Sequence, residues 1–223
     1  MSRYDRLLEL SSFSEEKLHL LQSKNVLIVG TGGVGQHIAV YLATNGIERL
    51  TIVDYDEVEL SNLNRQLLSS EKDVGKDKVF VVKAALLQVN SDIKVEALKM
   101  KLDSSNIKEI PTNFDVVIDA VDNWETKLLL TRFCNENHIP FLHVGVDGYG
   151  GQYCLFKGKS LLDLVSDSVK EEKRDGVLGP MVGLISSMAC LHLIRYLAGE
   201  DVETDTIFSY DAETNMLLKG KIC

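Results

Sequence analysis

Residues 25–35, NVLIVGTGGVG, decide the fold of this 223-residue chain. The first five residues are an apolar run that ends in glycine, which predicts a buried parallel strand. Gly30, Gly32 and Gly35 then fit the pattern G-x-G-x-x-G. Glycine lets the backbone turn tightly and approach a phosphate group at the start of the next helix, where N–H groups are free to bind it. The run therefore predicts a strand, a phosphate-binding turn and a helix.

A helix and a second strand complete a βαβ unit after the glycine turn. Residues 33–44 have helical spacing, with an apolar side formed by Val34, Ile38, Tyr41 and Leu42. Residues 49–53 read as another buried strand, which ends at Asp54. An acidic residue about 20 positions after the glycine turn suits a ribose hydroxyl. This βαβ pattern binds dinucleotides and mononucleotides alike, so by itself it does not distinguish NAD from ATP.

The rest of the chain continues the alternation of strands and helices. Helices are predicted at 2–22, 75–89, 104–109, 125–137 and 178–197, and strands at 93–98, 114–120 and 141–144. Three short strands, 152–156, 206–210 and 216–219, surround the last helix, and the charged segment 157–175 is predicted to be a mobile crossover loop. The expected fold is an α/β, Rossmann-like, mostly parallel sheet flanked by helices and extended by antiparallel C-terminal strands.

The bulk properties exclude several classes of protein. The net charge of −9 argues against a general nucleic-acid binder. Residues 1–16 are polar throughout, which is unlike a signal peptide, and the apolar run 178–198 is interrupted by His192 and Arg195, which favours a core helix over a membrane span. The four cysteines form no C-x-x-C pair, so we expect no zinc site and a reducing, cytoplasmic location.

A polar and basic cluster follows the βαβ unit. In residues 61–66, SNLNRQ, Arg65 offers a planar fork for phosphate oxygens, and Asn62 and Gln66 can donate hydrogen bonds. Lys78 follows on the next predicted helix. Each of these features alone is compatible with a solvated surface loop. Together they predict a protein that holds a triphosphate and breaks it.

Asp122 and Asn123 follow an apolar strand at the edge of the sheet where ligands bind in open α/β folds. A carboxylate there can hold Mg²⁺ on a triphosphate. Either residue can instead be the N-cap of the helix at 125–137, and the two roles are compatible.

These motifs resemble the MoeB/ThiF/HesA group of adenylyltransferases, the bacterial relatives of ubiquitin-activating enzymes. The resemblance covers almost the whole chain. Its motifs are RYxR (3–6), VLIVGxGGxG (26–35), DxDxV (54–58), SNLxRQ (61–66), DVGxxK (73–78), DxxDN (119–123), GxxGP (176–180) and YDA (210–212).

The resemblance implies that the protein binds ATP and Mg²⁺ and transfers AMP to the C-terminal carboxylate of a small ubiquitin-like protein or peptide. It assigns ATP contacts to Gly33, Asp54, Asn62, Arg65, Gln66 and Lys78, a Mg²⁺ ligand to Asp122, and an ATP contact in a neighbouring subunit of a homodimer to Arg6. Gly30, Gly32, Asp56 and Asn123 lie in the same motifs and complete the predicted nucleotide site. A carboxylate is already ionised at pH 7, so positioning and charge neutralisation are the main tasks, with Arg65, Lys78, Asp122 and Arg6 as the predicted catalytic residues.

The same resemblance divides one domain, residues 1–223, into a helical segment (1–24), a nucleotide-binding half (25–150) and a carrier-binding half (151–223). Two departures limit the likeness. Many relatives carry two zinc-binding C-x-x-C pairs, whereas Cys154 and Cys223 have no such partner here. Some relatives also carry a cysteine in the crossover loop, and the corresponding residues 171–175 contain none. We therefore expect no zinc and no covalent thioester through that loop.

The leading hypothesis is an adenylyltransferase that activates a sulfur-carrier protein ending in Gly-Gly. A peptide-modifying or tRNA-modifying enzyme of the same group, such as a relative of the tRNA threonylcarbamoyladenosine dehydratase, is an alternative, although the acidic balance disfavours tRNA. An NAD-dependent oxidoreductase is a third reading, but no His or Tyr–Lys pair is placed for hydride transfer. A non-catalytic scaffold would have no need of Arg65, Lys78 and Asp122.

Overall fold

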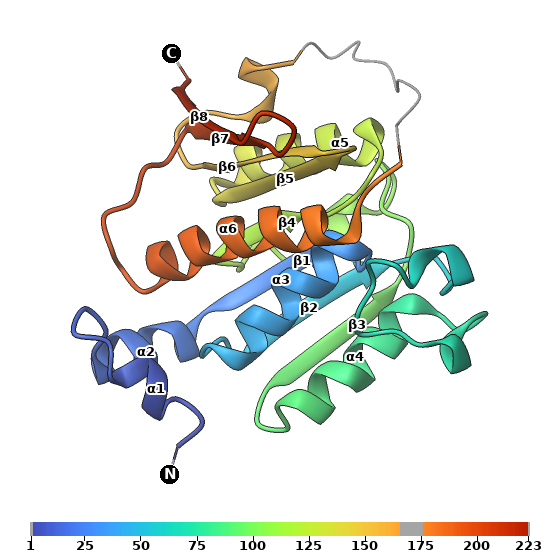
Figure 1. Ribbon diagram of the computed structural model, residues 1–223, viewed down its shortest axis with the longest axis horizontal. Coiled ribbons are helices and arrows are strands. Elements are labelled where there is room, and N and C mark those ends of the chain that lie inside the picture. Colours follow the sequence, from blue (N-terminus) through green and yellow to red (C-terminus); the bar gives the residue numbers. More distant parts are fainter. Residues whose placement is uncertain (1, 166–175, 223) are drawn as a thin grey trace.

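An eight-stranded sheet forms the centre of the computed structural model, which describes residues 2–165 and 176–222 (Figure 1). The spatial order of the strands is β3-β2-β1-β4-β5-β6-β7-β8. Neighbours from β3 to β5 are parallel, and neighbours from β5 to β8 are antiparallel. The strands are β1 (Asn25–Val29), β2 (Arg49–Asp54), β3 (Lys94–Lys99), β4 (Val116–Asp119), β5 (Phe141–Asp147), β6 (Gly150–Phe156), β7 (Thr206–Asp211) and β8 (Met216–Lys221). The predicted parallel sheet with an antiparallel extension is confirmed.

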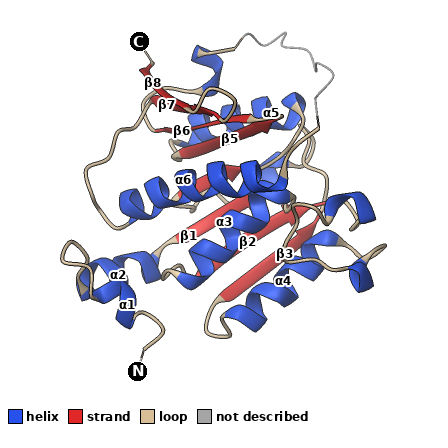
Figure 2. Ribbon diagram, in the orientation of Figure 1, coloured by secondary structure: helices blue, strands red, loops and turns tan. Residues whose placement is uncertain are grey.

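Helices cover both faces of this sheet (Figure 2). One face carries α3, α4 and α6, and the other carries α5. The helices are α1 (Asp5–Leu8), α2 (Glu15–Ser23), α3 (Gly33–Thr44), α4 (Lys78–Val89), α5 (Trp124–Asn137) and α6 (Gly179–Leu197). In β1, Val26 and Ile28 pack toward α3 and α6, whereas Leu27 and Val29 pack toward α5. Burial of both faces is the reason why this strand reads as a continuous apolar run.

The position of the functional cleft follows from the strand order. The chain proceeds from β1 to β2 and β3 in one direction and places β4 and β5 on the other side of β1. Neighbouring loops therefore diverge at the carboxyl ends of β1 and β4, which leaves a crevice at that edge of the sheet. The glycine turn follows β1, and Asp122 follows β4, so both lie at the crevice.

Three predicted helices differ in their bounds. The predicted helix 2–22 is two helices, α1 and α2, because a turn at residues 9–14 separates them. The predicted helix 75–89 begins only at Lys78, because Gly75 has a φ of +82° and its N–H donates to the carbonyl of Val58 across a loop contact. The segment 104–109 forms only a short 3-10 helix, Ile107–Glu109.

The apolar side predicted for the helix 33–44 is correct for Ile38 and Leu42, which are buried, and for Val34, which packs partly against the core. It is wrong for Tyr41, which is 39% exposed. The phenol oxygen of Tyr41 lies 3.4 Å from Ser187 Oγ on α6, so Tyr41 lies at the outer rim of the contact between the two helices.

The second half of the chain returns to the sheet through α6. Residues 157–165 contain a short 3-10 helix, Leu161–Asp163, and the remainder of the predicted crossover loop, including residues 171–175, lies outside the described part of the chain. Among the described helices, α6 alone has the length and hydropathy of a membrane span. Its inner side, with Met181, Ile185 and Leu193, is buried against the sheet, as predicted for a core helix.

Candidate active site

A cleft of about 1280 Å³ lies across the carboxyl ends of β1, β2, β4 and β5. Its first half is lined by the glycine turn, by the polar segment 54–66, by Lys78 and by the loop after β4. Its second half is lined by the ends of β5 and β6, by Gly176 and Val177, and by Ser209. The two halves are continuous, so one ligand can extend from the glycine turn to the antiparallel part of the sheet.

Two glycines of the turn, Gly30 and Gly35, have no room for a side chain. Gly30 has a φ of +92°, and a Cβ on it would lie 2.5 Å from the carbonyl oxygen of Ala120. A Cβ on Gly35 would lie 2.0 Å from the carbonyl oxygen of Gly30. The start of α3 therefore remains open toward the cleft, with Gly32 and Gly33 among the lining residues. This geometry suits an anion at a helix N-terminus.

Asp54 holds this turn in place. One carboxylate oxygen accepts hydrogen bonds from Thr31 N at 2.6 Å and Thr31 Oγ1 at 2.9 Å, and the other accepts from Asp56 N at 2.8 Å. Asp54 lines the cleft but is buried, whereas the side chain of Asp56 is half exposed. The predicted ribose contact of Asp54 stays a prediction, and Asp56 is the more accessible carboxylate of the two.

Lys78 is a buried cation at the start of α4. Its side chain is 6% exposed, and Nζ lies 3.3 Å from Oδ2 of Asp56. The backbone N–H of Lys78 also donates to the carbonyl of Asp56 at 2.9 Å, which fixes the helix start against the end of β2. A phosphate group that enters the cleft can take the place of Asp56 as the partner of this ammonium group.

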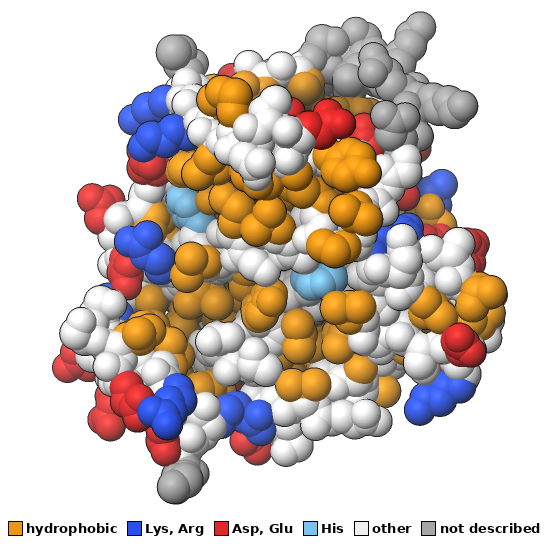
Figure 3. Space-filling model, in the orientation of Figure 1, with side chains coloured by type: hydrophobic (Ala, Val, Ile, Leu, Met, Phe, Trp, Pro, Cys, Tyr) orange, Lys and Arg blue, Asp and Glu red, His pale blue; other side chains and the backbone are white. Residues whose placement is uncertain are grey.

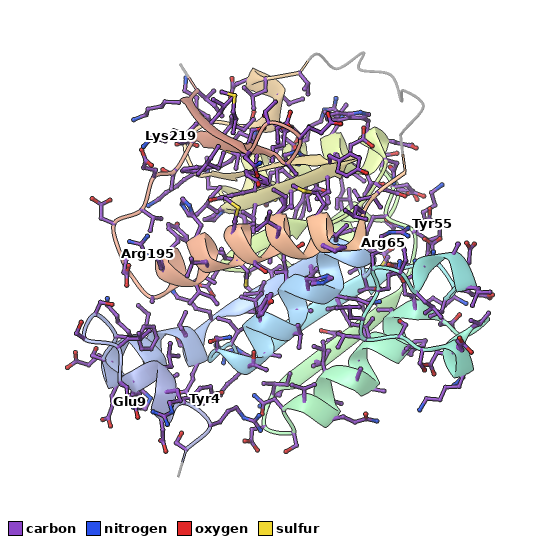
Figure 4. The ribbon with its side chains drawn as sticks, in the orientation of Figure 1. Tyr4, Glu9, Tyr55, Arg65, Arg195 and Lys219 are labelled. Carbon is purple, nitrogen blue, oxygen red and sulfur yellow. The ribbon has the colours of Figure 1, made fainter. Side chains whose placement is uncertain are left out.

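The segment after β2 presents its predicted ligands from a short 3-10 helix, Leu60–Asn62. Asn62 lines the cleft; its Oδ1 accepts from the backbone N–H of Glu59 at 3.2 Å, and its Nδ2 donates to Ser61 Oγ at 3.5 Å. Arg65 Nη1 donates to Asn64 Oδ1 at 2.8 Å and to Ser61 O at 3.1 Å, so only part of the guanidinium is used within the loop. Figure 4 shows Arg65 and Tyr55 at the same end of the molecule.

The side-chain oxygen of Gln66 is buried without a hydrogen-bond partner in the described part of the chain. The residue is 3% exposed, and its Oε1 has no hydrogen-bond partner among the described residues. Its Nε2 lies 3.7 Å from the position of a Cβ on Gly32, so the amide faces the glycine turn. A buried amide oxygen without a partner costs stability, and a ligand group that donates a hydrogen bond to Oε1, such as a hydroxyl, would satisfy it.

Asp122 and Asn123, in the loop between β4 and α5, have different roles. Asn123 is the N-cap of α5, because its Oδ1 accepts from Thr126 N at 2.8 Å. Asp122 is exposed, and within the described part of the chain its carboxylate makes no hydrogen bond or ion pair. The capping role predicted for this pair thus belongs to Asn123, and Asp122 is left available for a metal ion. The predicted nucleotide contact of Asn123 stays a prediction.

The sequence reasoning missed an aromatic and apolar wall on the cleft. Tyr55, Met100 and Leu102 line it at the ends of β2 and β3, and Lys101 Nζ lies 5.7 Å from the centre of the Tyr55 ring. Partial burial raises the pKa of Tyr55, and the carboxylates of Asp56, Asp122 and Asp54 raise it further, so the ring stays a neutral phenol. Such a wall suits the flat face of a nucleobase. Its sequence signal was the large side chains that follow the strand ends directly.

A buried charged cluster at the floor of the cleft was also missed. Asp119 is fully buried; Lys127 Nζ lies 3.0 and 2.9 Å from its two oxygens, and His143 Nδ1 lies 2.7 Å from Oδ2. Burial raises the pKa of Asp119, but Lys127 and His143 outweigh this effect, so its pKa is lowered. Burial and Lys127 also lower the pKa of His143. The signal was charged residues inside otherwise apolar strands and helices.

Arg6 lies far from the cleft of its own chain. It belongs to α1, and Figure 4 shows Tyr4 and Glu9, which flank it, at the opposite end of the molecule from Arg65. The Arg6 side chain is 89% exposed and, among the described residues, pairs only with Glu9, at 2.6 Å. The structure therefore does not bring Arg6 together with the other predicted catalytic residues of the same chain.

The described cysteines offer no metal site. Cys134, Cys154 and Cys190 are buried, and burial raises the pKa of each thiol, that of Cys154 to about 12. Within residues 2–165 and 176–222, no group of His, Cys, Asp and Glu side chains is arranged to hold a metal ion. Buried thiols of this kind are inert.

The fold and the cleft define a nucleotide-binding α/β protein of the doubly wound class. The family model of the ThiF family matches residues 4–221, and the chain belongs to that family. It is 34% identical over 200 residues to the molybdopterin-synthase adenylyltransferase of Haemophilus influenzae, covering 86% of this chain and 82% of that protein. It is 30% identical over 220 residues to the sulfur carrier protein ThiS adenylyltransferase of Escherichia coli, covering 96% and 88%. The SAMP-activating enzyme E1 of Haloferax volcanii is 32% identical over 224 residues, covering 95% and 82%.

Solved structures show the same fold. The crystal structure of E. coli MccB with MccA-N7isoASN aligns with a TM-score of 0.89 over 99% of this chain and 72% of that chain, at 24% identity. At this level of identity the likeness concerns the fold alone.

Proposed function

We propose that this protein is an ATP-dependent adenylyltransferase that activates the C-terminal carboxylate of a small ubiquitin-like sulfur carrier ending in Gly-Gly. The product is an acyl-adenylate, and pyrophosphate is released. One observation carries the proposal: a single cleft joins the glycine turn, Arg65, Lys78 and Asp122 to a second half whose lining includes Gly145, Gly150 and Gly151. A nucleotide and an extended peptide end can therefore lie end to end in it.

The proposed reaction needs no strong base from the residues of the cleft. A carboxylate is ionised at pH 7 and attacks the α-phosphorus directly, while the electrons of the broken P–O bond leave with pyrophosphate. The residues must align the two groups and neutralise the negative charge. Lys78 and Arg65 would offset the charge of the phosphates, and the turn before α3 would hold them through N–H groups.

The charged side chains that line the cleft support a requirement for Mg²⁺. Within the described part of the chain, three cationic side chains line the cleft, Arg65, Lys78 and Lys127, against six carboxylates, Asp54, Asp56, Glu57, Glu59, Asp122 and Asp147. A triphosphate that enters alone would meet a surplus of negative charge. The exposed carboxylate of Asp122, which has no partner among the described residues, fits a Mg²⁺ ion, because Mg²⁺ prefers oxygen ligands and remains partly hydrated. When bound, this ion would supply positive charge at the phosphate oxygens.

The second half of the cleft favours a substrate tail of small residues. A Cβ on Gly151 would lie 2.5 Å from Ile185 Cγ1, so β6 runs close beneath α6 at this point. Gly145 stands opposite Gln152 in the register between β5 and β6. Gly145, Gly150 and Gly151 add no side chains to the lining of this half, which supports a tail of small residues such as Gly-Gly.

We also propose that the active form is a homodimer in which Arg6 reaches the ATP of the partner subunit. The distance of α1 from the cleft of its own chain supports this arrangement (Figure 4). So does the apolar surface over α3 and α6 in Figure 3, which includes exposed Leu184 and Leu191 and the outward-facing Tyr41. An apolar patch of this kind is typical of a protein interface.

ATP–pyrophosphate exchange tests the proposed reaction. We expect exchange with Mg²⁺ and a ThiS-type or MoaD-type carrier, and none with the same carrier lacking its terminal Gly-Gly. Asp122→Ala should abolish the exchange and weaken ATP binding in calorimetry. Binding of NAD without binding of ATP would contradict the proposal, as would ATP binding without exchange for any carrier or C-terminal peptide.

Complementation between subunits tests the dimer. Arg6→Ala and Asp122→Ala should each be inactive alone, whereas a mixed dimer restores one intact site and part of the activity. If the mixture stays inactive while subunit exchange is shown by mass, or if Arg6→Ala alone is fully active, Arg6 does not act across the interface.

A further inference from the structure

His143 is a buried side chain at the floor of the cleft that the adenylation chemistry above does not use. It lies on β5, is 2% exposed, and belongs to the lining of the cleft. One ring nitrogen, Nδ1, lies 2.7 Å from Oδ2 of Asp119. The other, Nε2, makes no hydrogen bond within the described part of the chain. The two sides of the ring thus face different surroundings, a fixed carboxylate and the open cleft.

The carboxylate determines which nitrogen carries the proton. Asp119 is ionised, because Lys127 and the His143 hydrogen bond lower its pKa despite its burial. An ionised carboxylate only accepts hydrogen bonds, so Nδ1 of His143 must be the donor. Burial and Lys127 lower the pKa of His143, which keeps the ring neutral at pH 7. Nε2 therefore presents a lone pair, and the cleft contains a hydrogen-bond acceptor at this point.

Gly145 leaves this acceptor accessible. It lies two residues further along β5, on the same face of the sheet as His143. A Cβ on Gly145 would lie 3.6 Å from His143 Nε2, 3.9 Å from His143 Cε1 and 3.8 Å from Gln152 Cγ. Glycine at this position keeps the space above Nε2 free. That space lies between the nucleotide half of the cleft and the outer ends of β5 and β6, where the last peptide group of a bound tail would pass.

We propose that His143 determines specificity for the substrate terminus, because its Nε2 accepts a hydrogen bond from the last peptide N–H of the tail. This inference rests on the proposed adenylation function and deepens it. The bond would orient the terminal carboxylate toward the α-phosphate. A substrate whose terminal residue has no N–H, such as proline or an N-methylated residue, would leave the acceptor unpaired and would place carbon against it. Sites that bind a polar group by hydrogen bonding reject analogues that lack it.

Two mimics of the acyl-adenylate test the proposal without a carrier. One joins acetyl-Gly-Gly to adenosine through a sulfamate, and the other joins acetyl-Gly-sarcosine, in which a methyl group replaces the last N–H. Calorimetry gives the ratio of their dissociation constants. Wild-type protein should bind the glycine compound about 10 to 100 times more tightly, the range expected when one buried hydrogen bond is lost.

Two variants test whether the preference for the glycine compound depends on His143. His143→Phe keeps a ring of similar size and leaves Asp119 paired with Lys127, and Gly145→Ala places a methyl group over Nε2. In both variants the glycine compound should bind more weakly. The ratio of the two dissociation constants should therefore fall to about twofold or less. Gly220→Ala on β8 is the matched control, since an added Cβ there meets nothing within 4 Å, and it should keep the wild-type ratio.

The outcomes separate the two proposals. Equal binding of both mimics by wild-type protein, or a preference that persists in His143→Phe, overturns the role of His143 and leaves the adenylation proposal intact. If wild-type protein binds neither mimic, nor adenosine sulfamate alone, the proposed function fails and this inference fails with it.

Discussion

Replacement of Lys127 by methionine should destabilise the protein in a way that depends on pH. Lys127 Nζ lies about 3 Å from both oxygens of Asp119, and the side chains of the two residues are 6% and 0% exposed. At that distance two unit charges attract by about 5 kcal/mol for an effective dielectric constant of 20. Removal of one partner of a buried pair typically costs about 3 to 5 kcal/mol, because the other charge stays buried without compensation. We expect a loss of this size in the free energy of unfolding at pH 8.

His143 should recover part of this loss in acid. Lys127→Met removes one of the two causes that lower the pKa of His143 and leaves burial and the hydrogen bond with Asp119, so the folded pKa of His143 should be higher in the variant than in the wild type. A group with a lowered folded pKa costs stability as the pH falls below its unfolded pKa, about 6.5, and the cost is smaller when the folded pKa is lowered less. The deficit relative to wild type should therefore be smaller at pH 5.5 than at pH 8.

Urea denaturation at the two pH values measures this effect. Lys24→Met is the control: it breaks a pair of the same kind, with Asp115 at 3.0 Å, but one that is partly exposed at 22% and 34%. It should cost less than about 1 kcal/mol at either pH. A deficit for Lys127→Met below about 1 kcal/mol at pH 8, or one that is equal at both pH values, would refute the electrostatic account of this cluster.

Three further outcomes follow from the same contacts. Gly35→Ala should severely destabilise the fold in thermal unfolding, because its Cβ would lie 2.0 Å from the carbonyl oxygen of Gly30; a melting temperature within a few degrees of wild type would show that the turn relaxes easily. Gln66→Leu should raise the free energy of unfolding by about 1 kcal/mol, because it removes an unpaired buried amide, and should weaken ATP binding in calorimetry. Wild-type stability should fall as the pH drops below about 6.5, because the unfolded state binds a proton at His143 that the folded state resists; His143→Phe should show a shallower fall in the same titration, and an unchanged fall would assign it to other groups.

Local patterns were sufficient for most of the fold. The apolar run of β1 and the turn after it are set by residues within 11 positions of one another, and the same holds for the helix that follows. Element ends were less predictable where a distant contact decides them. The start of α4 at Lys78 depends on the hydrogen bond from Gly75 to Val58, and the exposure of Tyr41 depends on where α6 lies.

The sequence by itself determined the glycine turn, the polar segment at 61–66 and the ligand edge of the sheet. Each of these features depends on residues that are consecutive in the chain and whose chemistry is the same in any fold. Only the tertiary structure decided which of these groups are free to act. It turned Asp54 toward Thr31, made Asn123 the helix cap and left Asp122 without a partner among the described residues. It also brought Asp119, Lys127 and His143 together from β4, α5 and β5. Hydrogen bonds over such separations depend on how strands and helices pack, and that arrangement leaves no periodic signal in the chain.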